Sequence, residues 1–245
     1  MTRFGSLALA MTLVSGAPAL AFAQPDSEDS GDETPGVGAD GAASGSAAKR
    51  HDSAKQSRRH KNKVVGQVVP DSQLRATPLP LPSGHVRLFG LASKEEADLD
   101  IFNDDGSFDV DELHQADHML RCKRTDTEKP IDPRLIVLLS HVYDHFGKRL
   151  EIVSGYRNQR KQTSFHFKGS ASDIRIDGVP PKKIVQFAST LDTGGMGIGL
   201  YPRARFVHID VRPAPSYRWI DNARPNPNSP DKRPPRGWKR KKLQS

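Results

Sequence analysis

Residues 205–211, with the sequence R-F-V-H-I-D-V, alternate between two kinds of side chain. Successive side chains of a β-strand point to opposite faces of its sheet, so the alternation predicts a strand with two different faces. One face is aliphatic and carries Val207, Ile209 and Val211. The other carries Phe206, His208 and Asp210. We therefore expect a sheet that packs one face on a hydrophobic core and presents an imidazole and a carboxylate on the other.

Three further segments show the same period of two, at residues 151–156, 171–176 and 195–201. In the second segment, Ile174 and Ile176 would point to the core, which turns Asp173 away from it. In the third segment, glycines alternate with larger apolar residues, so we expect a strip of bare glycines on one face. Glycine allows a ligand to approach closely, and such a strip would suit an extended peptide.

Helical segments separate these strands. Residues 133–146 place apolar side chains on one face, after an N-cap at Asp132 and before a stop at Gly147. A second helix is expected after residues 179–181, and another after Asp109. Helices mixed with short strands predict an α+β domain, which we expect to contain a small antiparallel sheet flanked by helices.

The ends of the chain differ in composition from this central part. Residues 1–23 have the features of a signal peptide, with Arg3, an apolar segment and an A-x-A cleavage site, so we expect an exported protein of the periplasm or cell envelope. No later segment is apolar enough to span a bilayer. We further expect a disordered linker at 24–63, an extended N-terminal segment at 64–105, the folded domain at 106–222 and a basic, proline-rich disordered tail at 223–245.

Three residues form a candidate metal site. His166 and Asp173 lie seven positions apart in the segment S-F-H-F-K-G-S-A-S-D, and His208 follows on the expected strand. Two imidazoles and one carboxylate make a three-ligand zinc set that leaves a coordination position open for water, which zinc activates for hydrolysis. The alternative interpretation is that these are unrelated polar residues in a chain with nine histidines.

Four motifs occur in one order along the chain. They are S-G-Y-R at 154–157, S-x-H-x-x-G-x-A-x-D at 164–173, G-x-G-x-Y-P at 197–202 and F-V-H-I-D-V at 206–211. Together they resemble the zinc D-alanyl-D-alanine metallopeptidases, in particular their murein endopeptidase branch, over about residues 132–219. The resemblance implies a Hedgehog/DD-peptidase-like fold, a zinc site made by His166, Asp173 and His208, and a peptidoglycan stem peptide or cross-link as substrate.

The resemblance also implies roles for residues around the metal. Arg157 matches the family arginine that holds the substrate carbonyl or carboxylate, although a structural salt bridge is the alternative. Ser164 matches a motif serine that hydrogen-bonds near the site, although it would equally suit a turn cap. Tyr156, which lies in the same motif as Arg157, is expected to contact substrate.

The motifs leave two roles open for the acid beside the metal. Several relatives carry an acid three residues before the last zinc histidine, where this chain has Arg205. Asp210 is the nearest acid on the same strand face, and we expect it to act either as general base or as the group that orients a ligand histidine.

Other functions fit the sequence less well. A catalytically silent module that binds wall peptides in the same pocket remains the main alternative. The formal net charge of +8 and the basic ends would suit nucleic acid, but interleaved aromatic residues are lacking, so we expect no nucleic-acid partner. A serine or cysteine hydrolase is disfavoured because the serines and the single cysteine, Cys122, lack a nucleophile motif. Within the peptidase class, the sequence is compatible with both endopeptidase and carboxypeptidase activity.

Overall fold

The structure, a computed structural model, describes residues 64–223. The expected signal peptide, the linker at 24–63 and almost all of the expected basic tail lie outside these residues. Within residues 64–223, none of the helices has the length and apolar character needed to cross a bilayer.

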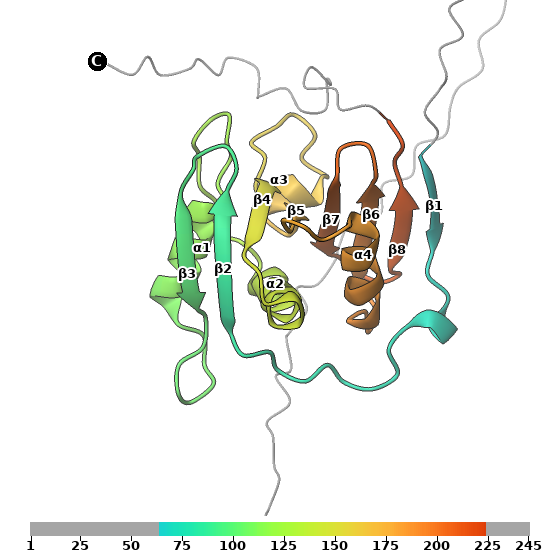
Figure 1. Cartoon of the computed structure of the whole chain (residues 1–245), viewed down its shortest axis with the longest axis horizontal. Coiled ribbons are helices and arrows are strands. Elements are labelled where there is room, and N and C mark those ends of the chain that lie inside the picture. The colour runs from blue at the N-terminus through green and yellow to red at the C-terminus, as the bar shows by residue number, and fades with distance from the viewer. Residues whose placement is uncertain (1–63, 224–245) are drawn as a thin grey trace, which may run out of the picture. The chain divides into compact units, whose positions relative to one another are not determined.

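The described part of the chain is an α+β fold built on one sheet (Figure 1). Its strands are β1 Val65–Val68, β2 His85–Gly90, β3 Glu96–Asp100, β4 Leu150–Ser154, β5 Ala171–Arg175, β6 Met196–Tyr201, β7 Phe206–Val211 and β8 Tyr217–Ile220. The helices are η1 Asp71–Gln73, α1 Val110–Met119, α2 Pro133–Phe146, α3 Phe165–Lys168 and α4 Pro181–Thr190. The strand order is β1-β8-β6-β7-β5-β4-β2-β3.

Two expectations about the sheet were wrong. The sheet is not small and antiparallel, because it has eight strands and is mixed: β2 runs parallel to β4, and β6 runs parallel to β8. Residues 64–105 are not only an extended lead-in, since they supply β1, β2 and β3. The signal for β2 was present in the sequence, because His85 and Arg87 alternate with Val86 and Leu88. Both Val86 and Leu88 are fully buried in the core.

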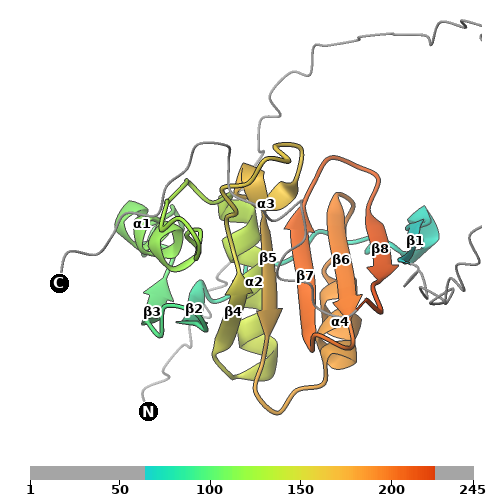
Figure 2. The same ribbon diagram turned by 90° about the horizontal axis from the view of Figure 1, so that it is seen from above.

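The aliphatic face of the sheet packs on two helices. In Figure 1, α2 and α4 lie below the middle strands and α3 lies above them, and Figure 2 shows α2 and α4 behind the strands. Helix α2 buries Leu135, Leu139 and Val142 in the same core as Val207 and Ile209 of β7. This burial leaves the opposite face of β5, β6 and β7 free to carry polar groups, as the alternation predicts.

The predicted limits of α2 are confirmed. The Asp132 carboxylate accepts a hydrogen bond from the Arg134 N–H, and Pro133 occupies the first turn, where its missing N–H costs nothing. Gly147 ends the helix in the left-handed conformation, with φ 59°, which favours glycine. The cap and the stop thus fix the helix that supports β7 from below.

We expect Leu139→Ala to destabilise the protein by about 2–5 kcal/mol, because Leu139 is fully buried between α2 and the sheet and its loss would leave a cavity. The free energy of unfolding from a denaturant titration checks this. Leu81→Ala is the matched control, since Leu81 is 60% exposed and should change that free energy by less than about 0.5 kcal/mol. Equal effects of the two substitutions would contradict this description of the core.

Candidate metal centre

Strand register aligns the polar residues in two rows across the sheet. In the first row, Asp173 of β5 lies opposite His208 of β7, which lies opposite Gly199 of β6, which lies opposite Trp219 of β8. In the second row, Ala171, Asp210, Gly197 and Tyr217 follow in the same strand order. A shift in the pairing of β4 with β5 places Ser154 opposite Asp173, at the end of the first row.

The third predicted ligand comes from α3, which lies between β4 and β5 in the chain. This four-residue helix ends at Gly169, whose left-handed backbone, with φ 80°, turns the chain into β5. A side chain at Gly169 would overlap the Pro130 carbonyl, so the turn requires glycine. The short helix places the buried His166 side chain over the Asp173–His208 pair.

The structure brings the three predicted ligands together. His166 Nε2 lies 3.1 Å from His208 Nδ1 and 3.3 Å from Asp173 Oδ1, and His208 Nδ1 lies 2.9 Å from the same oxygen. All three side chains are buried. Atoms that share a tetrahedral ion at about 2.0–2.1 Å are about 3.3 Å apart, so these three atoms have the spacing of metal ligands.

Hydrogen bonds on the outer side of each ring fix its orientation. His166 Nδ1 donates to the Gly155 carbonyl oxygen at 2.7 Å, and His208 Nε2 donates to Asp210 Oδ2 at 2.8 Å. Because both outer nitrogens carry a proton, each inner nitrogen presents a lone pair when its ring is neutral. Two lone pairs and one carboxylate oxygen that converge in a buried site require a cation, so these residues fit a metal ion.

Electrostatics prepare the three groups for this task. Burial, together with the positive charge of Arg157, lowers the pKa of His166 to about 4. Burial alone would raise the pKa of Asp173, but the Arg157 charge and the two imidazoles hold it well below its usual value. Burial would lower the pKa of His208, but its hydrogen bonds to Asp173 and Asp210 outweigh burial and raise it. Asp173 is therefore ionised and His166 neutral at pH 7.

Asp210 lies on the far side of His208 from the three ligand atoms. It is fully buried, and both of its oxygens accept hydrogen bonds from Arg212, from Nε at 2.7 Å and from Nη2 at 2.5 Å. The Arg212 guanidinium stands over the Phe165 ring at 4.6 Å. Sequence reasoning missed Arg212, although the period of two that places His208 and Asp210 on one face also includes position 212.

The other predicted site residues take different positions. Arg157 pairs through Nη2 with Asp173 Oδ2, the oxygen that faces away from the histidines, and its Nε donates to Ser154 Oγ at 2.8 Å. Ser164 is the N-cap of α3, but its hydroxyl makes no cap hydrogen bond. Tyr156 is only 7% exposed and belongs to the core, so little of its ring is available to a substrate.

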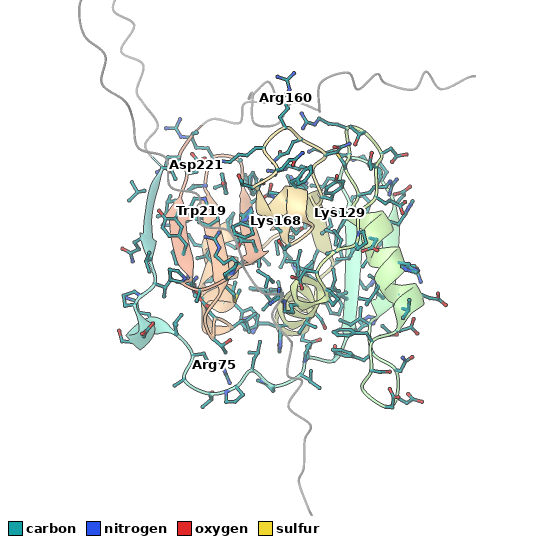
Figure 3. The ribbon with its side chains drawn as sticks, turned by 180° about the vertical axis from the view of Figure 1, so that it is seen from behind. Arg75, Lys129, Arg160, Lys168, Trp219 and Asp221 are labelled. Atoms are coloured by element: carbon teal, nitrogen blue, oxygen red, sulfur yellow. The ribbon has the colours of Figure 1, made fainter. Side chains whose placement is uncertain are left out.

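The expected strip of bare glycines is covered. A Cβ atom at Gly199 would overlap the Trp219 ring, and one at Gly197 would overlap Asp210 and Arg212. These glycines therefore make room for the protein's own side chains and do not form an open track for a peptide. The Trp219 ring, labelled in Figure 3, lies 5.0 Å from the His208 ring, so it flanks the site.

Arg205 lies outside this group of residues. It is exposed in the turn between β6 and β7, where its φ is 57° and its N–H bonds the Tyr201 carbonyl. Within residues 64–223, Asp173 and Asp210 are the two carboxylates that contact the ligand histidines.

Comparison with known proteins gives a consistent result. The model of a family described as peptidoglycan L,D-endopeptidase MepK matches residues 83–219. The chain is 32% identical to the probable peptidoglycan L,D-endopeptidase MepK of Haemophilus influenzae over 123 residues, which cover 44% of this chain and 65% of that protein. It is 34% identical to the peptidoglycan L,D-endopeptidase MepK of Escherichia coli K12 over 127 residues, which cover 46% and 69%. No solved structure matches.

We expect metal binding at pH 6 to release close to one proton (about 1 per site), because only His208 is protonated there in the metal-free protein. The apparent affinity should rise with pH until the raised pKa of His208 is passed. The folding stability of the metal-free protein depends on pH in the opposite direction. The charged His208 stabilises the fold below the pKa that it has in the unfolded chain, and this contribution is lost as the pH rises through its pKa in the folded protein. Calorimetric titration in buffers of different ionisation enthalpy counts the protons, and a count near two or near zero would contradict the assignment.

Proposed function

The chain belongs to the peptidoglycan L,D-endopeptidase MepK family of metallopeptidases, and from this premise we propose that it is a zinc peptidase that cleaves peptide cross-links in peptidoglycan. The observation that carries the proposal is the convergence of His166, Asp173 and His208 to within 3.3 Å inside the segment that the family model matches. The chain covers about two thirds of the length of the curated relatives, so the activity is inferred from this shared part.

Zinc is the metal that suits this set of ligands best. Two imidazole nitrogens and one carboxylate oxygen are typical of catalytic zinc sites, which keep a further position open. Zinc bound there would polarise the scissile carbonyl and generate a nucleophile from water at neutral pH. The chain's own part is to hold the ligand atoms rigidly and to exclude solvent, which the burial of all three side chains supports.

We assign Asp210 the role of positioning residue for His208 and not that of general base. Support comes from its contact with the outer ring nitrogen and from the two hydrogen bonds that it accepts from Arg212. Burial alone would raise the pKa of Asp210, but the bonds from Arg212 and His208 outweigh burial and lower it. A fully buried carboxylate with such partners is a poor proton acceptor and a good anchor for an imidazole.

Arg157 is proposed to serve both the metal centre and the substrate. Its Nη2 holds the outer oxygen of Asp173, while its Nη1 has no hydrogen-bond partner among residues 64–223. The unused N–H groups would be available to the substrate carbonyl or to a nearby carboxylate, where a permanent positive charge stabilises developing negative charge.

The chain around α3 favours an anionic peptide. Residues 155–170 contain four basic side chains and no acidic one: Arg157, Arg160, Lys161 and Lys168. Arg160, which precedes α3, and Lys168, its last residue, are labelled in Figure 3. Stem peptides of peptidoglycan carry free carboxylates, so a cationic rim would attract them. Together with the expected signal peptide, this supports action in the cell envelope.

We expect the full-length protein loaded with zinc to split cross-linked muropeptides, and His166→Ala to abolish cleavage, since a site with two ligands holds zinc poorly. Chelation should inactivate the wild type, and added zinc should restore it. Mass spectrometry of the products distinguishes an internal cut from release of a terminal residue. The control is His114→Ala, an exposed histidine on α1. A wild type that holds zinc and cleaves nothing would favour the silent binding module.

We expect Asp210→Asn to weaken zinc binding about 10- to 100-fold, because the amide is a poorer acceptor for His208 Nε2. Competition with a chromophoric chelator measures this affinity. Asp98→Asn is the matched control, since Asp98 also contacts a histidine and an arginine but lies at the surface. If Asp210 were the general base, zinc affinity would be unchanged and only the rate of cleavage would fall.

A further inference from the structure

Tyr201 is the last residue of β6 and lies on the same face of the sheet as His208. Side chains of β6 alternate, so Gly197, Gly199 and Tyr201 share the face opposite to the core residue Ile198. Gly199 is directly opposite His208, and Tyr201 is directly opposite Phe206. Tyr201 is therefore a diagonal neighbour of His208, a separation that an aromatic side chain bridges.

Two contacts hold the Tyr201 ring in place. The ring stacks on Phe206, with centroids 4.3 Å apart and planes at 20°. Its hydroxyl oxygen accepts a hydrogen bond from Trp219 Nε1 at 3.1 Å, and the Trp219 ring is the one that lies 5.0 Å from the ring of His208. The phenol thus reaches across the gap above Gly199 toward the indole that flanks the metal centre.

The Trp219 contact also decides what the Tyr201 hydroxyl does with its own proton. An indole N–H is only a donor, so the hydroxyl must act as acceptor toward Trp219 and keeps its O–H for another partner. Among residues 64–223, the hydrogen bonds of Tyr201 include no acceptor for that proton. The Tyr201 side chain is only partly buried, so its O–H can donate to a group that approaches this face of the sheet.

The charges of the metal centre act on this hydroxyl. Burial raises the pKa of Tyr201, the Trp219 hydrogen bond opposes that shift, and the nearby Asp173 carboxylate adds to it, while Arg157 acts in the opposite direction. The geometry agrees, because the hydroxyl contacts Trp219, whose ring lies 5.0 Å from that of His208, the strand partner of Asp173. A phenol is protonated at neutral pH even without this rise, so the hydroxyl is available as a hydrogen-bond donor.

We propose that Tyr201 is a catalytic residue that donates a hydrogen bond from its hydroxyl to the oxygen of the scissile carbonyl as negative charge develops there. The inference rests on the proposed peptidase function. The substrate would be a peptide whose scissile carbonyl approaches this face of the sheet between Trp219 and the ligand residues. Trp219 fixes the direction of the hydroxyl in advance, so little reorganisation is needed when charge appears, and such donors account for large rate effects.

The test uses the zinc-loaded full-length protein and a cross-linked muropeptide dimer, and it compares the wild type with Tyr201→Phe. This change removes one oxygen and keeps the ring on Phe206. We expect kcat to fall about 100-fold, with KM changed less than about twofold and zinc content unchanged. Tyr143→Phe is the matched control, because Tyr143 lies on α2 beside His85 and should keep full activity.

A second measurement separates transition-state binding from ground-state binding. A phosphinic analogue of the cleaved dipeptide carries the charged oxygens of the tetrahedral state, and Tyr201→Phe should weaken its binding by a factor similar to the loss in kcat. Trp219→Phe, which removes the N–H but keeps an aromatic ring, should show a smaller loss of the same kind. These matched losses would support the proposal.

Three results would overturn it. They are an unchanged kcat in Tyr201→Phe, an increase of KM alone, and a loss of zinc or of folded structure in that variant, which would assign Tyr201 to the framework. A wild type without peptidase activity is a different outcome, because it refutes the proposed function before Tyr201 is tested.

Discussion

The pairing of Asp173 with His208 across β5 and β7 is the contact on which the site depends. Their inner atoms are 2.9 Å apart, and His166 of α3 completes a buried group with two nitrogen lone pairs and one carboxylate oxygen. Such a group is stable only around a proton or a metal ion, because nothing inside it donates. The protein directs its fixed hydrogen bonds outward, to the Gly155 carbonyl and to Asp210, and thereby keeps the inner atoms aimed at one point.

The glycines of β6 show how the rest of the face serves that pair. Gly197 leaves room for Asp210 and Arg212, and Gly199 leaves room for Trp219, so bulky side chains from neighbouring strands fold over the centre of the sheet. This packing connects His208 to more distant residues through two series of contacts. One runs from His208 through Asp210 to Arg212, and the other runs from His208 past Trp219 to the hydroxyl of Tyr201. Both depend on positions where any larger residue would clash.

Family membership and site geometry support each other, although they are independent observations. The family match describes which chains share this segment, and the geometry explains what the segment is built to hold. The basic residues between 155 and 170 fit the anionic peptide proposed as substrate, and Arg157 links them to the metal ligand Asp173. A silent binding module would need the same ligands, so the roles proposed for Arg157 and Tyr201 are what would distinguish a peptidase from such a module.

The sequence by itself determined the local features. Alternation located β4 to β7, the Asp132 cap and the Gly147 stop delimited α2, and the motif spacing named all three residues of the metal group. These are short-range properties, set by backbone geometry and residue type. Only the tertiary structure decided which residues and strands contact each other. It determined the mixed eight-stranded sheet and the contribution of β1 to β3 to it. It also determined the covered glycines, the core position of Tyr156 and the contact of Asp210 with the outer nitrogen of His208. Strand order and ring orientation depend on contacts between residues far apart in the chain, and a period of two does not record which strand lies beside which.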